Sequence, residues 1–260
     1  MNNIYNLLNN HSSIRKYKKD PVSKELLEKI LTASIQGTSS SGNMQTYSVI
    51  ITTDQKIKEE LYPLHFEQEM VLEAPVMMTF CCDFNRMILW LKDRDAKENF
   101  DNFMSFMIGS IDAILYSQTV ALAAESEGLG ICYMGTTLAN CLKISEVLKL
   151  PKNVVPVVGY SLGYPDENPR TKDRLPLEGL IHYETYKNYE SNDISKIYQE
   201  RETKGWERYM SNSELKEMIE KNGVQNLAQI YTTIKYTKES HIEYSNTVLE
   251  CLKKQNFFNN

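Results

Sequence analysis

The stretch MSFMIGSIDAILYSQTVALAAESEGLG, from Met104 to Gly130, contains the longest apolar run in the chain. One charged residue, Asp112, stands within the run, and Glu125 and Glu127 close it without a flanking basic cluster. A charge at mid-span is costly in lipid, so the stretch is not expected to cross a membrane. A helix that is buried on most sides, within a soluble domain or between subunits, is the better prediction. The two glycines at its end are typical of a helix C-terminus.

The segments on both sides of this helix mix strands and helices without a repeating order. We expect strands at residues 47–53, 75–82, 131–134 and 154–162, and helices directly after Ser23 and at 54–61, 141–149 and 242–252. Residues 75–82 are almost wholly apolar, so this strand should be covered on both faces. Neither GxGxxG nor GxxxxGK(S/T) occurs, which leaves the common nucleotide-binding fingerprints without support. The sequence therefore predicts an α+β fold, with helices around a mostly antiparallel sheet.

The composition is that of a soluble globular protein. Of the 260 residues, 42% are hydrophobic, and the formal net charge is −5, so a large basic face for nucleic acid is not expected. The first ten residues lack a basic start followed by an apolar run, so no secretory signal is expected. The five cysteines show no CxxC spacing, which disfavours disulfides or a metal site and favours a cytoplasmic setting. Cys81 and Cys82 are adjacent in the apolar strand, where inert thiols are more common than a redox pair.

The first candidate binding segment is His11–Arg15 (HSSIR), which three lysines follow by residue 19. An imidazole, two hydroxyls and a guanidinium within five residues form a compact set of donors for an anion. The arginine fork matches phosphate geometry, and hydroxyls add neutral hydrogen bonds. Taken alone, a solvated basic turn ahead of a helix is the better interpretation, because exposed charge is common.

Three further segments carry groups that suit a polar ligand. They are the loop Thr38–Asn43 (TSSSGN) with Gln45 beyond it, the segment Gly128–Thr136 (GLGICYMGT), and the loop Asn168–Pro176 (NPRTKDRLP). The first offers hydroxyl and amide groups, the second lets a backbone approach a flat ligand closely, and the third concentrates cations in an acidic protein. Each has a structural alternative: a flexible surface turn, a structural turn, and surface ion pairs that contribute little.

In order and spacing, these segments resemble the nitroreductase family. The HSSIR motif, the serine-rich loop, the ESEGLG end of the long helix and the NPxxKxRLP loop follow in the family's order, over about Ile4 to Tyr186. The similarity is greatest to the NADPH-dependent branch of oxygen-insensitive nitroreductases and flavin reductases. The resemblance implies a nitroreductase-like α+β sandwich, an intertwined homodimer, and FMN at the subunit interface. It also implies a core of residues 1–185, with residues 186–260 as a helical excursion and C-terminal arm packing on the core or the partner.

The resemblance further implies which residues bind the cofactor. The FMN phosphate matches His11, Ser12, Ser13 and Arg15, with a second cationic clamp at Lys172 and Arg174. The ribityl chain or the ring edge matches Ser40 and Gln68, and the strand end whose backbone N–H reaches flavin N5 matches Tyr133, Met134, Gly135 and Thr136. An amide is chemically sensible at N5, because N5 gains the hydride. No residue is expected to act as a catalytic nucleophile or base.

The chain departs from the family pattern at three places. Ser12 stands where arginine is usual, and Lys16 is a candidate to compensate for the lost charge. Gly135-Thr136 replaces a pair of glycines and adds a hydroxyl near the ring. The late basic loop that reads the NADPH phosphate in this branch corresponds to Lys204–Lys221, where glutamates alternate with the cations. We therefore expect activity with both NADPH and NADH.

The expected function is ping-pong hydride transfer from NAD(P)H through FMN to small acceptors such as nitroaromatics, quinones or free flavin. Two alternatives remain open at this point. The protein could be an FMN reductase that supplies reduced flavin to a partner enzyme, or a non-catalytic dimer that keeps the fold as an interaction module. Free exchange of FMN during turnover distinguishes the first alternative, and a colourless protein that takes up no FMN distinguishes the second.

Overall fold

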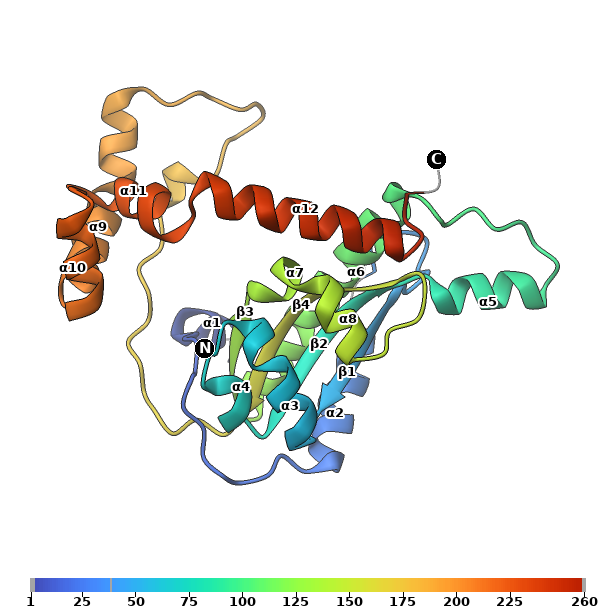
Figure 1. Ribbon diagram of the computed structural model, residues 1–260. Coiled ribbons are helices and arrows are strands. Elements are labelled where there is room, and N and C mark those ends of the chain that lie inside the picture. Colours follow the sequence, from blue (N-terminus) through green and yellow to red (C-terminus); the bar gives the residue numbers. More distant parts are fainter. Residues whose placement is uncertain (1–2, 38, 259–260) are drawn as a thin grey trace. The chain divides into compact units, whose positions relative to one another are not determined.

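The computed structural model describes residues 3–37 and 39–258 (Figure 1). Its elements in chain order are α1 (Asn3–Asn10), α2 (Lys24–Ile35), β1 (Tyr47–Thr52), α3 (Gln55–Leu61), η1 (Pro63–His65), α4 (Met70–Glu73), β2 (Val76–Asp83), α5 (Asn85–Asp93), α6 (Phe103–Ser126), β3 (Gly130–Met134), α7 (Thr136–Ala139), α8 (Cys141–Val147), β4 (Val154–Gly163), η2 (Leu177–Gly179), α9 (Ser191–Met210), α10 (Ser213–Lys221), α11 (Leu227–Ile230), η3 (Tyr231–Lys235) and α12 (Lys238–Lys254). The mixed order of helices and strands confirms the predicted α+β class.

The sheet has the strand order β1-β2-β4-β3, and all three pairings are antiparallel. All eight residues of β2, at the centre, are buried, which confirms that this strand is covered on both faces. Side chains alternate along it as the pleat requires: Met78 and Phe80 enter the larger core cluster, whereas Met77 enters the smaller one.

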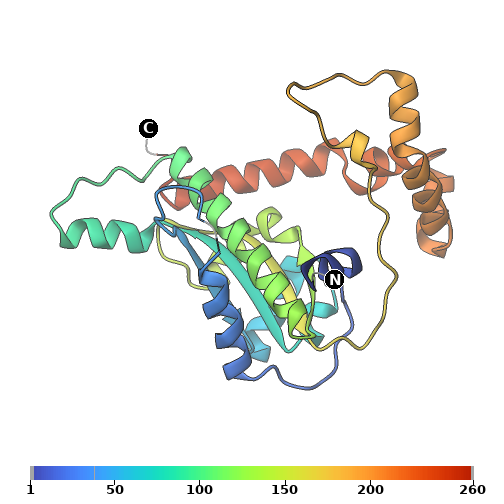
Figure 2. The same ribbon diagram turned by 180° about the vertical axis from the view of Figure 1, so that it is seen from behind.

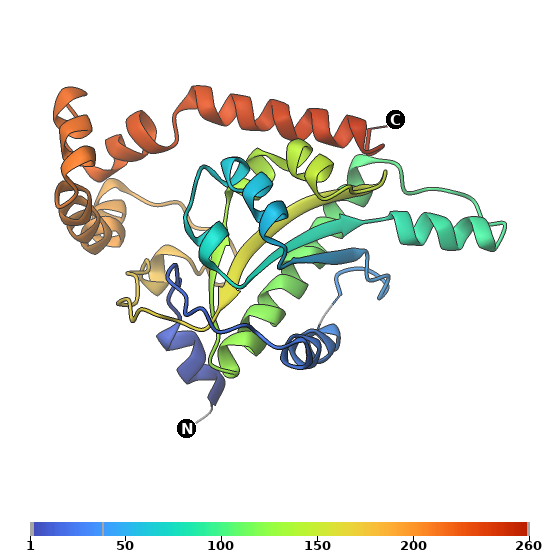
Figure 3. The same ribbon diagram turned by 60° about the horizontal axis from the view of Figure 1, so that its bottom comes forward.

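Helices cover both faces of the sheet. The long helix α6 packs against β2 and against α2, and the view from behind shows these two helices side by side (Figure 2). On the opposite face lie α3, α4, α7 and α8, so that the sheet is the middle layer of three (Figure 3). At Gly109, an added Cβ would lie 2.5 Å from the Cys82 sulfur and 2.9 Å from the Thr46 carbonyl. The glycine is therefore what lets α6 approach the sheet so closely.

Helix α6 is the longest helix among the described residues. It alone among them has the length and hydropathy of a membrane span, and half of its most apolar window is buried in the protein. Asp112 lies in the middle of this helix and is only 1% exposed. A buried carboxylate must find protein partners, and Asp112 finds them in the site described below. The buried half of α6 agrees with the predicted core helix, whereas Met104, Met107, Ile111 and Ile114 are exposed.

Capping residues explain several confirmed boundaries. Ser23 caps α2 by accepting a hydrogen bond from the Leu26 amide, and Asp54 caps α3 by accepting from the Ile57 amide. Helix α5 was not predicted, because its cap residue Phe84 makes no side-chain capping bond and gives no start signal. The last helix was expected at residues 242–252, and α12 extends beyond both of those ends.

The chain forms two compact units. Unit 1 runs to Arg170 and takes up the chain again from Tyr244, and unit 2 is Thr171–Glu243. Unit 1 contains the whole sheet, whereas unit 2 is built of helices and loops. In unit 1, the returning C-terminal segment buries Leu252 and Phe257 in the larger core cluster. The functional division expected at residues 185 and 186 stays a prediction.

All five cysteines are free and buried. Burial raises the pKa of the thiols of Cys81 and Cys82, so both are held in the protonated form. Thiolates, not thiols, are the reactive species. The structure therefore favours inert core cysteines over a redox pair.

Candidate functional site

Three polar side chains of α6 each hold one of the predicted binding segments. Asp112 contacts the serine-rich loop, Ser117 contacts Tyr133 at the end of β3, and Glu125 contacts His11 of the HSSIR motif. These polar residues, within the apolar run and at its end, are thus the points at which α6 contacts the candidate site. The sequence contained this signal, because a charge within a buried helix requires partners.

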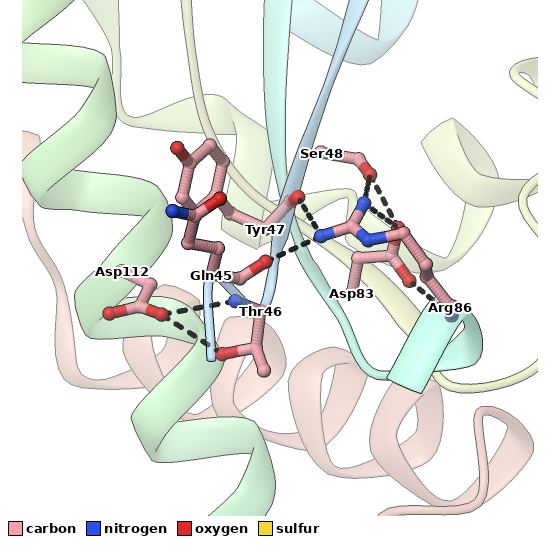
Figure 4. A network of polar contacts seen from close by, with 7 residues as sticks. All are labelled: Gln45, Thr46, Tyr47, Ser48, Asp83, Arg86 and Asp112. Carbon is pink, nitrogen blue, oxygen red and sulfur yellow. Dashed lines mark hydrogen bonds and ion pairs between the residues drawn. The ribbon is translucent and has the colours of Figure 1, made fainter. Parts of the chain in front are cut away.

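Asp112 organises the serine-rich loop through backbone groups at both of its ends, and Figure 4 shows its contacts with Thr46 at one of them. Its carboxylate accepts hydrogen bonds from the Ser40 amide at 2.6 Å and from the amide and hydroxyl of Thr46, both at 3.1 Å. The Ser39 hydroxyl adds contacts at 3.4 Å. Burial raises the pKa of Asp112, but the hydrogen bonds from Ser40 and Thr46 outweigh it, and the pKa lies below its ordinary value. Thr38, which we included in this loop, lies outside the described residues.

The segment following the loop is fixed by Arg86 and Asp83 (Figure 4). The Arg86 guanidinium donates to the carbonyls of Gln45 and Tyr47 and to the Ser48 hydroxyl. Asp83 accepts from the Ser48 hydroxyl and forms an ion pair with Arg86. Residues 39–48 are therefore held by a carboxylate at one end and by an ion pair at the other.

Between these two anchors, the loop has an unusual backbone. Asn43 and Gln45 have φ angles of 51° and 53°, and Gly42 has 56°. Left-handed conformations are uncommon for residues other than glycine and are retained where the surroundings enforce them. Gln45 also bonds the Asn43 side chain at 3.1 Å. The anchors thus present the loop in one defined shape.

The HSSIR segment lies beside β3. The Ile14 amide donates to the Ile131 carbonyl at 2.9 Å, and the Ile14 side chain occupies the space that a Cβ on Gly130 would need. Within the glycine-bounded segment, Gly130 therefore leaves room for Ile14. His11 donates from Nδ1 to a Glu125 carboxylate oxygen at 2.6 Å, which fixes its ring.

Ser12 and Ser13 are half-buried, and Arg15 is exposed. Among the described residues, no acidic side chain forms a salt bridge with the Arg15 guanidinium. The amides of Arg15 and Lys16 both donate to one carboxylate oxygen of Glu167, and these bonds hold the pKa of Glu167 below its ordinary value. Glu167 was not singled out from the sequence, where it is one acidic residue in a polar loop.

A small cavity of about 290 Å³ opens beside this segment. Its lining includes His11, Ser12, Glu125, Gly130 and Pro165. Imidazole, hydroxyl and carboxylate groups therefore meet at one concave surface of unit 1. Unit 2 contains a larger cavity of about 760 Å³, which residues between Pro176 and Ile197 line.

The end of β3 is held from both sides. The Ser117 hydroxyl donates to the Ile114 carbonyl, so the 3.1 Å bond between Ser117 and Tyr133 is donated by the tyrosine. Met134 is buried, whereas Gly135 is exposed and a Cβ there would meet no atom within 4 Å. The backbone after Met134 therefore faces open space, as a strand end that approaches a flat ligand requires.

Gln68 and Thr136 are brought together by a residue that was not predicted, His65. The Thr136 hydroxyl lies 2.7 Å from Nδ1 of His65, and the Gln68 side-chain amide donates to the His65 carbonyl at 2.8 Å. Burial lowers the pKa of His65 to about 4. No sequence pattern around Pro63–His65 indicated this role.

The remaining predicted residues, Lys172 and Arg174, begin unit 2 and are exposed. Between them, Asp173 pairs with Arg201 at 3.5 Å and with Arg208 at 4.0 Å. The side chains of Lys172 and Arg174 form no salt bridge among the described residues.

Comparison with known proteins adds an independent line of argument. A family model described as the nitroreductase family matches residues 8–164. An FMN reductase of Bacillus subtilis, whose name specifies NAD(P)H, is 34% identical over 86% of this chain and 98% of its own length. An oxygen-insensitive NADPH nitroreductase of Salmonella typhimurium is 38% identical over 69% of this chain and 73% of its own. The solved structure of nitroreductase A from Vibrio parahaemolyticus aligns over the full length of both chains, with a TM-score of 0.82 and 29% identity.

Proposed function

The chain belongs to the nitroreductase family, and from that premise we propose that it is an NAD(P)H-dependent oxidoreductase that uses FMN. The observation that carries the proposal is the arrangement around α6, which attaches three of the four predicted binding segments to one helix through Asp112, Ser117 and Glu125. The names of two relatives, an FMN reductase and an NADPH nitroreductase, support the same function.

The residues present fit FMN by the chemistry of their donors. Within unit 1, hydroxyls, an imidazole and the Arg15 guanidinium lie together in the HSSIR segment, a donor set suited to a phosphate. The open backbone at Gly135 suits the edge of a flat ring. Glu167 already uses the amides of Arg15 and Lys16, so we assign the phosphate to the side chains of this segment and not to those amides.

In this proposal, His11, Ser12, Ser13 and Arg15 bind the phosphate, and Lys172 and Arg174 supply its second clamp. Ser40 and Gln68 would bond the ribityl chain or the ring edge, and the backbone of Tyr133–Thr136 would hold N5. FMN supplies the ring that carries the hydride, so no protein nucleophile or base is required. The chain's own task is to orient the ring and to control what stacks on it.

Kinetics test this proposal directly. Because the reduced nicotinamide and the acceptor take turns at one ring face, initial rates at several fixed acceptor concentrations should give parallel double-reciprocal lines. Nitroaromatics, quinones and free flavin are the acceptors to compare. Intersecting lines with each acceptor would contradict the ping-pong scheme.

A second function is favoured by the name of the Bacillus subtilis relative, an FMN reductase. In that case, the protein would release reduced FMN to a partner enzyme. Turnover in the presence of isotopically labelled FMN distinguishes the two functions. Retention of unlabelled FMN through many turnovers supports the oxidoreductase with a resident cofactor, whereas complete exchange supports the flavin supplier.

We also propose a homodimer, in which residues 186–260 pack on the core or on the partner subunit. One face of α6 supports it: Met104, Met107, Ile111 and Ile114 recur at three- and four-residue intervals and are 39–66% exposed. A continuous apolar stripe of this kind marks an interface. We propose the cytoplasm as the setting of this dimer, because all five cysteines are free.

Replacing Ile114 with glutamate should break this dimer, because a charge buried in an apolar interface costs several kcal/mol. Light scattering should give twice the chain mass of 30.1 kDa for the wild type and the single mass for the variant. The matched control is Ile57→Glu on α3, where the side chain is also exposed but lies outside the stripe. A wild-type protein of 30.1 kDa at micromolar concentration would contradict the homodimer.

A further inference from the structure

His65 is a buried titratable residue that is not among the residues assigned to FMN binding above. It ends the short turn η1 and is 2% exposed. Burial lowers the pKa of its imidazole to about 4, so the ring is neutral near pH 7. Its Nδ1 lies 2.7 Å from the Thr136 hydroxyl, a distance typical of a good hydrogen bond.

The partner of His65 is Thr136, one of the residues at which this chain departs from the family pattern. Thr136 stands at the second position of the usual glycine pair and is the first residue of α7. A threonine hydroxyl otherwise rotates to suit its surroundings. The bond to a buried imidazole holds the oxygen in one place, next to the open backbone at Gly135.

The same turn also holds Gln68, which is predicted to bond the ribityl chain or the ring edge. The His65 carbonyl accepts a hydrogen bond from the Gln68 side chain at 2.8 Å, and the Leu64 carbonyl accepts from Asn140 at 2.7 Å. Between His65 and Gln68, Phe66 and Glu67 have φ angles of 56° and 54°. Two successive left-handed residues that are not glycine are costly and persist only where their surroundings fix them. The turn thus connects Gln68 to α7 through defined contacts.

We propose that His65 is a positioning residue, which holds the Thr136 hydroxyl at the flavin N5 edge through its imidazole and holds the Gln68 carboxamide through its carbonyl, and that the Thr136 hydroxyl thereby sets the relative affinity for oxidised and reduced FMN. This inference rests on the proposed function. The physical reason is that N5 accepts a hydrogen bond when oxidised and carries a hydrogen when reduced, so a fixed hydroxyl beside it stabilises the two states unequally. The inference gives the buried His65 a role at the position where threonine replaces the usual glycine.

The test measures the dissociation constants of oxidised and reduced FMN for the wild type, Thr136→Val, His65→Leu and the double variant. Each single change should alter the ratio of the two constants about three- to tenfold, the effect of one hydrogen bond. A tenfold change equals about 30 mV in the two-electron potential. Because both changes remove the same bond, the double variant should resemble the single variants.

Two controls separate this role from general packing. Thr137→Val removes the neighbouring hydroxyl, which bonds the Met134 carbonyl and not His65, and should leave the ratio unchanged. His65→Asn retains a hydrogen-bonding group near Nδ1 and should restore the wild-type ratio. In the cofactor-free protein, His65→Leu should also speed amide hydrogen exchange at residues 66–68 and 134–137 together.

The outcomes are distinct. A wild-type protein that binds no FMN overturns the proposed function and this role with it. A protein that binds FMN normally, but whose ratio changes less than twofold in both Thr136→Val and His65→Leu, overturns the inference alone. Additive effects in the double variant would also overturn it, because they would mean that the two residues act separately.

Discussion

Charged and polar groups are used differently in the two units. In unit 1, Asp112 is almost fully buried, and backbone and hydroxyl donors from two ends of one loop surround it. In unit 2, Lys204 pairs with Glu200 and Lys216 with Glu220, one helical turn apart, with at least half of each side chain exposed. The buried carboxylate in unit 1 fixes the shape of a loop. The ion pairs in unit 2 lie on the solvent-exposed faces of helices and hold no loop in place.

The difference lies in what each interaction holds in place. When a buried carboxylate is replaced, several buried hydrogen-bond donors are left without an acceptor. Each of these donors lowers the free energy of unfolding. An exposed ion pair that is lost is replaced by water at little cost. Substitutions in unit 1 should therefore have large effects on stability and on the candidate site, and charge substitutions in unit 2 should have small ones.

The largest effect is expected at Asp112. Asp112→Asn keeps the shape of the side chain but removes its charge and turns an amide donor toward donors of the loop. The loss of two or more charge-assisted hydrogen bonds should lower the free energy of unfolding by about 3–5 kcal/mol. Urea unfolding measures this change, and FMN affinity should fall with it, because the loop carries Ser40.

A matched control is Thr46→Val, which removes one donor to Asp112 and retains the carboxylate. Its effect should be about 1 kcal/mol. If Asp112→Asn unfolds at the same urea concentration as the wild type, the buried network does not hold the loop.

The next effect concerns pH and His65. The pKa of His65 is about 4 in the folded protein against an ordinary value of 6.5. Between these values, the unfolded chain binds more protons than the folded one, so stability falls as the pH is lowered from about 6.5 to about 4. The full loss should be about 3 kcal/mol. The free energy of unfolding, measured with urea at several pH values across this range, should change less steeply with pH for His65→Asn than for the wild type. An equal dependence on pH in both proteins would contradict the account.

A smaller effect is expected in the choice of nicotinamide. The cations of the late chain that could read the NADPH phosphate are largely paired: Arg208 with Asp173 and Lys216 with Glu220. One partly solvated charge contact contributes on the order of 1 kcal/mol, so NADPH should be favoured over NADH about fivefold. Values of kcat/KM for both, at one salt concentration, measure the preference. A preference above about a hundredfold, or about 2.7 kcal/mol, would reveal a dedicated phosphate site.

The smallest effect is expected from a surface pair of unit 2. Lys216→Ala removes the ion pair with Glu220 on α10 and should change the free energy of unfolding by less than about 0.5 kcal/mol. Chemical denaturation at low and at high salt checks this value. A loss of several kcal/mol would mean that unit 2 relies on its charges as unit 1 does, and the contrast between the units would fail.

Sequence patterns predicted the elements that depend on local chemistry. Ser23 and Asp54 were interpreted as helix starts, and each caps its helix. The apolar run of β2 predicted a strand covered on both faces. Asp112 was noticed as a charge that disfavours a membrane span, but its partners lie far away in the sequence and could not be read from it.

His65 and Glu167 were missed for a related reason. Neither residue type is unusual in its local sequence, and each acquires a role only through tertiary contacts, with Thr136 in one case and with the amides of Arg15 and Lys16 in the other. The binding segments themselves were recognised because their order along the chain resembles a known family. Local patterns therefore predicted helices and strands, and the family resemblance predicted the binding segments. The contacts that hold these segments in place could be found only in the structure.

The visible absorption spectrum, followed by anaerobic titration with NADPH and with NADH, tests the central claim most directly. The account predicts a yellow protein with flavin absorbance and one FMN for each chain, whose bands bleach as either reduced nicotinamide is added. A protein that shows no flavin absorbance, even after incubation with FMN, would contradict it.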